Sequence, residues 1–535
     1  MTKAFQTNAP QGRFLGAHLF IAFSAGIMCH FSFAPYQLQW LAPLSIAILF
    51  AQLTAFDQLS TKKNFLLGLS FGFGLFSAGL RWVHVSIADY GGLPLPISIL
   101  LMAILALYLA LFPALASAIF GRYRNNHLTH NAIFFSCLWV LAEFVRGKVL
   151  TGFPWLLLGY SQTQGLFSQS AAIIGVLGLS LVVVALGCFA TNAIKKSKRG
   201  LLAVIIIVAF SIGLSRVSTI QTLDKQVDFA LVQGNIAQSA KWQQDEMWPT
   251  ITSYMDLTRH QFTADIIIWP EAAMPAVEAW VSDYLRLMDS AANVNDSAII
   301  TGIIGRDDSI NHLTLANNID QVSNQSQQTQ YYNALITLGN DQQKQQEQGS
   351  YTRNHLNRYY KHQLLPIGEF VPFRSLLQPL APLFNLPMSS FSRGEWAQPN
   401  LTALGYNFAP AICYEIAFPE LVRANMRSNT DFLLTVSNDA WFGRSIGPHQ
   451  HMEIAQMRAI ELGRPLIRVT NNGVTAIVNP QGEIEKKLPQ FTQSILREKV
   501  NLVKGQTYYY QYGQLPVILF SMFFAVAIGL VNRFR

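Results

Sequence analysis

Charged residues are scarce in this 535-residue chain. Asp, Glu, Lys and Arg make up 13% of it, whereas about a quarter of a typical soluble domain is charged. Hydrophobic residues make up 51%, and 36 residues are phenylalanine. This composition excludes a protein that is soluble along its whole length. Cysteine is also rare: Cys29, Cys137 and Cys188 lie in long apolar stretches, Cys413 lies in a polar region, and no disulfide is expected.

Several functional signatures are missing. The sequence has no phosphate-binding glycine loop and no dinucleotide fingerprint, so we expect no cofactor of that kind. His449 and His451 are two residues apart, which does not place them on one helix face, and no third ligand accompanies them; we therefore expect no metal. The formal net charge of +8 comes largely from short basic loops, so we do not interpret it as nucleic-acid binding.

The apolar residues are concentrated at the two ends of the chain. A bilayer-spanning helix needs about 20 mostly apolar residues. The candidates are residues 14–34, 39–56, 64–84, 94–118, 131–146, 168–193, 200–216 and 514–532. The first lacks a signal-peptide cleavage site, so we expect it to be retained. The sequence thus predicts a multi-pass α-helical membrane domain with about eight spans.

Lysine and arginine gather in alternate loops between the apolar runs. The residues concerned are Lys3, Arg13, Lys62, Lys63, Arg122, Arg124, Lys195, Lys196, Lys198, Arg199, Arg533 and Arg535. Because cytoplasmic loops carry such an excess, both termini are predicted to be cytoplasmic and the polar block to lie on the other side. The chain then divides into a membrane domain with seven helices (1–219), an extramembrane domain (220–510) and an eighth helix (511–535). Residues 320–350 are rich in glutamine and are interpreted as a surface insertion.

The extramembrane block alternates short β-rich runs with amphipathic stretches. Eight runs are typical of buried strands that end in polar or turn residues, namely 227–235, 265–271, 297–304, 332–339, 408–415, 431–439, 465–473 and 474–482. Residues 449–463 have helical spacing, with Gly463 as the expected stop. Strands that alternate with helices indicate an α/β layered domain.

Three chemically useful side chains follow predicted strands. Glu271 follows DIIIWP, Lys361 follows NRYY, and Cys413 closes FAPAI. A thiol needs a base to become a nucleophile, and a carboxylate can serve. A nearby ammonium favours the thiolate and can stabilise the oxyanion of a tetrahedral intermediate. The set suits acyl transfer, although a surface Glu, a solvated Lys and a small buried Cys are the alternative interpretation.

The surrounding motifs resemble a known superfamily. IIIWPEAAMP, YYKHQLLPIGEFVPFR and AICYE carry Glu271, Lys361 and Cys413 in the order found in the nitrilase superfamily of carbon–nitrogen hydrolases; SNDAWFG (437–443) and RAIELGRPLIRVTNNG (458–473) extend the resemblance. This implies a nitrilase-like αββα sandwich domain. Its insertion between membrane spans, together with VQGNIAQSAKW (232–242) and TGFPWLLLGYSQ (151–162), resembles the apolipoprotein N-acyltransferase family.

That resemblance implies an enzyme of the bacterial inner membrane with a periplasmic catalytic domain. It would move an acyl chain from a phospholipid, typically phosphatidylethanolamine, to the N-terminal amine of a diacylglyceryl apolipoprotein. Cys413 would form the thioester, Glu271 would be the base, and Lys361 would polarise the carbonyl with the Tyr414 N–H. The remaining matches are Glu369, which would orient the set, and Trp242, Tyr414 and Glu415 around the pocket. We expect no cofactor and a monomer.

Other interpretations stay open at this point. A membrane-tethered nitrilase or amidase that hydrolyses a small amide would use the same three residues. A non-enzymatic membrane protein, such as a transporter, is a third possibility. Glu143 and Arg146, three residues apart near the end of the fifth span, are expected to form a structural ion pair. The apolar stretch 380–391 is expected either to contact the membrane or to be buried.

Overall fold

The computed structural model describes residues 11–55, 60–307, 329–339, 351–353, 355–366, 368–369 and 391–533. The apolar stretch 380–391 therefore lies outside the described residues except for Phe391, and the glutamine-rich segment 320–350 is described only at 329–339. The chain forms two compact units. One comprises Met1–His84, Pro94–Val217 and Tyr512–Arg535, and the other comprises Val85–Leu93 and Ser218–Gln511.

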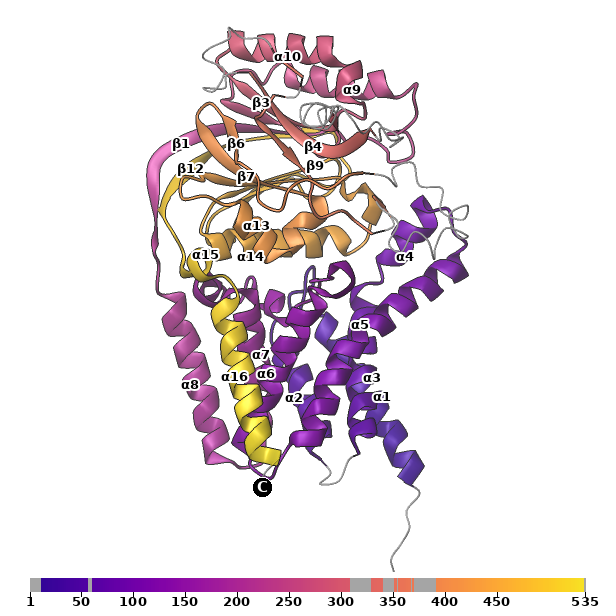
Figure 1. Ribbon diagram of the computed structural model, residues 1–535, viewed down its shortest axis with the longest axis vertical. Helices are drawn as coiled ribbons and strands as arrows, with labels where there is room; N and C mark the ends of the chain where they lie inside the picture. Colours follow the sequence, from indigo (N-terminus) through magenta and orange to yellow (C-terminus); the bar gives the residue numbers. More distant parts are fainter. Residues whose placement is uncertain are drawn as a thin grey trace, which may run out of the picture. The chain divides into compact units, whose positions relative to one another are not determined.

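The first unit is helical (Figure 1). Its long helices are α1 (Gln11–His30), α2 (Leu41–Thr54), α3 (Thr61–Gly79), α5 (Leu95–Tyr123), α6 (Leu128–Arg146), α7 (Ala171–Ile194), α8 (Lys198–Ser215) and α16 (Leu515–Arg533). The short helix α4 (Val83–Val85) follows α3, and the 3-10 turns η2 (Val149–Thr151), η3 (Leu158–Gln162) and η4 (Ser168–Ser170) lie between α6 and α7.

Each predicted span falls on one of these long helices. Among the described residues, five helices are long and apolar enough to cross a membrane: α5, α6, the run Ser168–Ile194 that contains α7, α8 and α16. A sixth is added if α3 and the bent segment after it are one span, whereas α1 and α2 are shorter apolar helices. Eight crossings therefore stay a prediction.

Helices α1 and α3 cross at glycines. A Cβ on Gly26 would lie 2.8 Å from the Leu75 backbone nitrogen, and a Cβ on Gly74 would lie 3.2 Å from that of Ile27. The two backbones can approach this closely because neither glycine has a side chain. Small residues at helix crossings are typical of membrane helix packing, where van der Waals contact replaces the hydrophobic effect.

Glu143 and Arg146 of α6 act on each other electrostatically, and each is also held by hydrogen bonds to other groups. Glu143 Oε1 accepts hydrogen bonds from Trp139 Nε1 at 3.0 Å and from the Leu158 backbone N–H at 2.9 Å. Arg146 Nη1 donates to the Trp155 carbonyl at 2.6 Å. Spacing along the helix did not reveal these additional contacts: the backbone of the following loop supplies a donor for the acid and an acceptor for the base.

Two six-stranded sheets form the second unit. The first has the order β12-β1-β2-β3-β4-β5, and the second has the order β11-β10-β9-β8-β7-β6. The first sheet contains β1 (Ile220–Gln233), β2 (Ile266–Ile268), β3 (Ala298–Asp307), β4 (Gln330–Gly339), β5 (Arg358–Tyr360) and β12 (Ser494–Gly505). The second contains β6 (Leu401–Ala403), β7 (Tyr406–Ile412), β8 (Phe432–Ser437), β9 (Leu466–Thr470), β10 (Ala476–Val478) and β11 (Ile484–Lys487).

The main core lies between the two sheets. Phe229 of β1 meets the ring of Phe432 of β8 edge-on, with centroids 5.1 Å apart, and Phe408 of β7 stacks on Phe432 at 5.4 Å. Such aromatic pairs add about 0.5–1.5 kcal/mol to the stabilisation from area burial. Helices α9 (Met247–Thr258) and α10 (Ser282–Val294) cover the outer face of the first sheet, and α13 (Pro419–Asn425) and α14 (Gly447–Leu462) cover that of the second (Figure 1). The unit is an αββα sandwich.

The eight predicted strand runs all coincide with strands, and the helix predicted at 449–463 is α14. Gly463 follows it in the left-handed conformation, at φ 62°. Strands β5, β6, β11 and β12 were not predicted. Among the residues of β12, exposed polar side chains interrupt the apolar ones, so its long pairing with β1 becomes evident only in three dimensions.

A short segment from between α3 and α5 belongs to the second unit. It contains the π-helix η1 (Ser86–Tyr90). Ser86 Oγ donates a hydrogen bond to the carbonyl of Trp441 at 2.7 Å, in the turn η9 (Asp439–Phe442) that follows β8. The second unit is therefore built from two parts of the chain that are distant in sequence.

Candidate active site

Polar side chains meet at the ends of strands from both sheets. Glu271 lies three residues after β2, whereas Lys361 directly follows β5 and Cys413 directly follows β7. Asn438 follows β8, the parallel neighbour of β7. Because parallel strands bring their carboxyl ends to the same edge of a sheet, this is where layered α/β proteins build sites.

Lys361 bridges two carboxylates. Its Nζ donates to Glu369 Oε1 at 2.8 Å and to Glu271 Oε1 at 3.2 Å. Asn333 of β4 donates to the same two oxygens, at 3.0 Å and 2.8 Å. The ammonium is 1% exposed. A buried charge is tolerated when it is paired and hydrogen-bonded, so the four side chains hold one another in a single arrangement.

Glu271 is also fixed from two other directions. The Asn438 backbone N–H donates to Oε2 at 2.8 Å, and Lys241 Nζ donates to the Glu271 main-chain carbonyl at 3.0 Å. Gly302 of β3 lies directly beneath this segment: a Cβ there would be 2.6 Å from the Pro270 carbonyl oxygen. The strand needs glycine at this point because the Glu271 backbone occupies the space of a side chain.

Cys413 sits at a strained turn. Its φ is +53°, a left-handed conformation that costs a non-glycine residue of the order of 1 kcal/mol or more. His451 Nε2 donates to the Cys413 carbonyl at 3.0 Å. Burial and the Arg468 charge lower the pKa of His451, although Asp439 acts to raise it. Its Nδ1 lies 3.0 Å from Arg468 Nη2 and 3.1 Å from Asp439 Oδ1. The imidazole thereby holds the main chain of the cysteine.

Glu415 ties this turn to the segment that follows Lys361. Its carboxylate accepts from the backbone N–H groups of Ile412 (2.7 Å), His362 (2.7 Å) and Gln363 (3.0 Å), and from the Tyr359 hydroxyl (3.0 Å). Burial raises its pKa to about 7, although these donors favour the charged form. The contacts of Glu415 are therefore those of a strut between the two sheets.

The other predicted residues have simpler surroundings. Trp242 is partly exposed, and Lys241 Nζ lies 5.9 Å from its ring centroid. The Tyr414 ring meets Phe418 edge-on, with centroids 5.0 Å apart. Sequence reasoning missed His451, which it considered solely as a metal ligand, and it missed Lys241 beside Trp242. The sequence did contain a signal for Lys241, because this lysine lies in the motif VQGNIAQSAKW, which is associated with the family.

The electrostatics define the resting protonation state. Burial raises the pKa of the Cys413 thiol, the Glu271 carboxylate raises it further, and Lys361 opposes both. Burial also tends to raise the pKa of Glu271, but Lys361 and Lys241 outweigh this effect and hold it below its ordinary value. Burial alone would lower the pKa of Lys361, and its two carboxylates raise it instead. The resting site is therefore a neutral thiol beside an ionised carboxylate and an ammonium.

The four cysteines differ in exposure. Cys29, Cys137 and Cys188 are fully buried, whereas Cys413 has accessible surface, and all four are free. Within the described residues, no group of three His, Cys, Asp or Glu side chains could hold a metal ion. The site can thus present one thiol to a substrate, with a proton acceptor and a fixed positive charge beside it.

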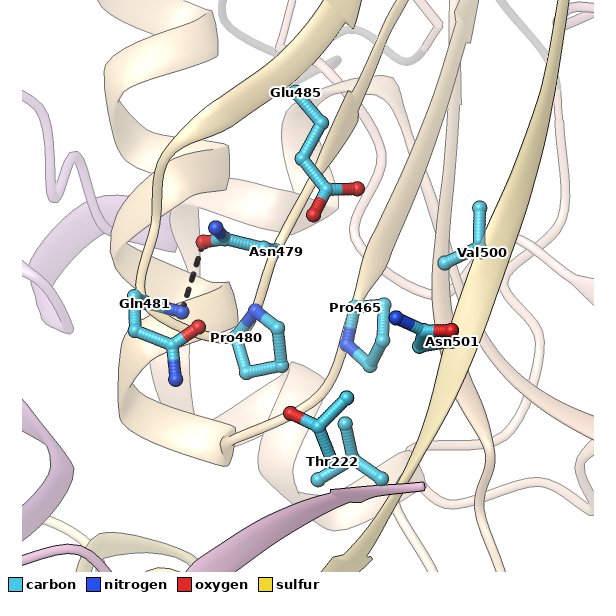
Figure 2. Close-up of a pocket in the computed structure, with 9 residues that line it drawn as sticks. Thr222, Pro465, Asn479, Pro480, Gln481, Glu485, Val500 and Asn501 are labelled. Atoms are coloured by element: carbon cyan, nitrogen blue, oxygen red, sulfur yellow. Dashed lines mark hydrogen bonds between the residues drawn. The ribbon is translucent and has the colours of Figure 1, made fainter. Parts of the chain in front are cut away.

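A separate cavity of about 230 Å³ lies at an edge of the second unit. Figure 2 shows its lining around the turn after β10, where the Gln481 backbone N–H donates to Asn479 Oδ1 at 3.0 Å. Pro465, Glu485 and Asn501 also line it. None of the predicted site residues lines this cavity.

Known families match both units. Residues 229–510 match the carbon–nitrogen hydrolase family, and residues 25–189 match the apolipoprotein N-acyltransferase N-terminal domain. The second unit, with its two packed sheets, is therefore a nitrilase-like domain of the carbon–nitrogen hydrolase class.

Relatives extend the match over nearly the whole chain. The apolipoprotein N-acyltransferase of Shewanella oneidensis is 50% identical and covers 95% of each chain. That of Photobacterium profundum is 45% identical over 94% of this chain and 93% of the relative, and that of Vibrio vulnificus is 45% identical over 92% and 93%. The chain belongs to the apolipoprotein N-acyltransferase family.

Proposed function

We propose that this chain is a phospholipid-dependent apolipoprotein N-acyltransferase that works through a thioester on Cys413. It takes an acyl chain from a phospholipid, with phosphatidylethanolamine as the expected donor. It places the chain on the α-amino group of the diacylglyceryl cysteine of an apolipoprotein. The family membership supports the overall reaction, and the arrangement of Glu271, Lys361 and Cys413 supports the roles given to the residues.

One observation carries the assignment of the nucleophile. Cys413 is the cysteine with accessible surface, and it stands at a strained strand end within the electrostatic influence of Glu271 and Lys361. A buried structural cysteine needs neither the strain nor the charges. Strain of this kind is typical of functional sites, where the surrounding structure holds a side chain in place.

The first half-reaction acylates Cys413. The sulfur attacks the ester carbonyl of the phospholipid while the thiol proton moves to Glu271, and the carbonyl electrons pass to oxygen. The ammonium of Lys361 stabilises this oxyanion. When the intermediate collapses, the carbon–oxygen bond to glycerol breaks, and the departing oxygen takes the proton from Glu271. A lysophospholipid leaves, and the thioester remains.

The second half-reaction consumes the thioester. The neutral α-amine of the acceptor attacks the thioester carbonyl, and Glu271 takes the proton that the nitrogen loses. Collapse breaks the carbon–sulfur bond, the new amide forms, and the sulfur recovers the proton from Glu271. An unperturbed α-amino group has a pKa of about 8, so this step slows in acid while the thioester persists.

Both substrates are lipids, which explains the membrane helices. Taking an acyl chain out of the bilayer costs about 0.8 kcal/mol for each CH₂. A catalytic domain anchored at the membrane surface avoids this cost. We place the enzyme in the bacterial inner membrane with eight spans, with the catalytic unit in the periplasm and both termini in the cytoplasm. Its monomeric state is likewise a prediction.

Cysteine labelling tests the topology. In a cysteine-free background, Gln481→Cys on an exposed turn of the catalytic unit should react with a membrane-impermeant maleimide in spheroplasts. Lys62→Cys, exposed at the start of α3, should react only after the membrane is opened. Labelling of both positions in intact spheroplasts would contradict the orientation.

A substitution series tests the reaction. Purified Cys413→Ala should neither form an acyl-enzyme nor acylate a diacylglyceryl lipopeptide, whereas Cys137→Ala should retain near wild-type activity. A matched assay with small soluble amides distinguishes the alternative enzyme. Turnover of amides without acyl transfer between lipids would replace the proposal with a membrane-tethered amidase.

A further inference from the structure

Lys241 is a second lysine at the base of the site. It lies between β1 and α9, and its side chain is 2% exposed. In the part of the chain that the structure describes, its ammonium donates one hydrogen bond, to the Glu271 carbonyl at 3.0 Å. A buried ammonium is costly unless nearby negative charge compensates it, so its position calls for a reason.

The charges around the site supply that reason. Among the described residues, the buried carboxyl groups around the site are those of Glu271, Glu369, Glu415 and Asp439, and the buried lysine and arginine cations are Lys241, Lys361 and Arg468. Arg468 pairs with Asp439 at 2.9 Å, and His451 Nδ1 lies 3.1 Å from the other Asp439 oxygen; burial and Arg468 lower the pKa of His451. Apart from Lys241, Lys361 is the cation among the described residues that acts on Glu271, Glu369 and Glu415. With all four carboxyl groups ionised and His451 neutral, the cluster without Lys241 would hold two more negative than positive charges.

We propose that Lys241 is a positioning residue of the acyl-transfer reaction: its ammonium fixes the Glu271 main chain and balances the negative charge that moves between Glu271 and Cys413. The proposal rests on the thioester chemistry proposed above. It assigns a second lysine to the site, beside the lysine of the Glu271, Lys361 and Cys413 set.

The proton transfer explains why one cation must act on both residues. Before attack, the negative charge is on the Glu271 carboxylate. When the S–H bond breaks, the proton goes to Glu271, the carbon–sulfur bond forms, and the charge appears on the oxyanion beside Cys413. Lys241 acts electrostatically on Glu271 and on Cys413. The charge can therefore move without becoming uncompensated.

Removal of this cation has a specific consequence. A buried site with excess negative charge relieves it by binding a proton, and Glu271 is the carboxylate that interacts electrostatically with Lys241. Protonated Glu271 cannot accept the thiol proton. As the pH falls, acylation in the variant should therefore be lost at a higher pH than in the wild type. An opposite charge at close range lowers a carboxyl pKa by about one unit or more, so the acid limb of the rate profile should rise by about one pH unit.

The lysine itself should produce the alkaline limb. Burial lowers the pKa of Lys241 to about 8, although Glu271 and Cys413 act to raise it. The acylation half-reaction contains no acceptor amine, so a limb near this pH reports on the enzyme and its donor. Arginine in place of Lys241 stays charged and should remove that limb.

The test is single-turnover acylation of the full-length protein in detergent, from about pH 5 to about pH 9. The donor is phosphatidylethanolamine with a fluorescent acyl chain, and the signal is the fluorescent protein band. Wild type, Lys241→Met and Lys241→Arg are compared, with Lys504→Met as the control that removes an exposed lysine of the same unit. If Lys241→Met does not fold, Lys241→Gln keeps a donor for the Glu271 carbonyl without the charge.

The expected result is an acid limb about one pH unit higher in the methionine variant, with a rate at neutral pH lowered about tenfold or more. Lys241→Arg should keep the wild-type acid limb, and Lys504→Met should match the wild type throughout. A methionine and glutamine variant whose rates fall uniformly, without a moved limb, would overturn the inference and leave a purely structural role. Failure of the wild type to form any thioester would refute the proposed function itself.

Discussion

Gly302→Ala should disturb the active site although it removes no polar group. The new Cβ would lie 2.6 Å from the Pro270 carbonyl oxygen and 2.9 Å from the Glu271 carbonyl carbon, whereas ordinary contact begins at 3.4 Å. The backbone from Pro270 to Ala272 must therefore retreat by at least 0.8 Å, the difference between 2.6 and 3.4 Å, because the Ala272 nitrogen would lie closer still. Misplacement of a catalytic group by about 1 Å can cost about 10²-fold in rate. We expect a loss of that order in thioester formation.

The assay is the single-turnover rate of acylation, measured beside thermal unfolding. Gly305→Ala is the matched control on the same strand: its Cβ would meet the end of the Tyr360 ring at 3.0 Å, a side chain that can move by a few tenths of an ångström. Its rate should fall far less. A Gly302→Ala enzyme that is folded and acylates at the wild-type rate would refute the account of how β3 positions Glu271.

Three further substitutions test other parts of the structure. Lys361→Met should slow acylation by about 10²–10³-fold, because it removes the cation that faces the developing oxyanion; a loss below tenfold would contradict that role. His451→Leu should slow alkylation of Cys413 by iodoacetamide about tenfold, because the hydrogen bond to the cysteine carbonyl is lost. His451→Gln should recover much of the rate. Equal rates in the two variants would show that the bond does not position the thiol. Phe432→Ala should lower the free energy of unfolding by about 3–5 kcal/mol, measured by denaturant titration of the catalytic unit's tryptophan fluorescence, and a change under 1 kcal/mol would contradict its place in the core between the sheets.

The sequence predicted the buried strands well because their composition is local information. Runs such as 265–271 are continuous apolar stretches that end at a polar residue, and each of them contains a strand in the structure. Strand β12 was missed because its apolar residues are interrupted by exposed polar ones. Its place is set by its pairing with β1, a partner about 270 residues away, and no local pattern contains that partner.

The site divides in the same way. Local sequence was enough to find Glu271, Lys361 and Cys413. Each lies in a family motif and follows its strand directly or closely. The contacts that hold them come from distant elements: His451 reaches the Cys413 carbonyl from α14, and Lys241 reaches Glu271 from beyond β1. Glu143 and Arg146 follow the same rule, since the hydrogen bonds that hold them include groups of the loop after α6, which spacing along one helix cannot indicate.

The most direct test of the central claim is a pulse and chase of the acyl-enzyme. The protein is loaded with phosphatidylethanolamine alone, freed of excess lipid, and analysed by intact mass and peptide mapping before a diacylglyceryl lipopeptide is added. We predict one acyl mass on Cys413, one equivalent of lysophospholipid, and transfer of the stored chain to the peptide amine when the acceptor arrives. Acyl mass on any other residue, or its loss to water before the acceptor is added, would contradict the account.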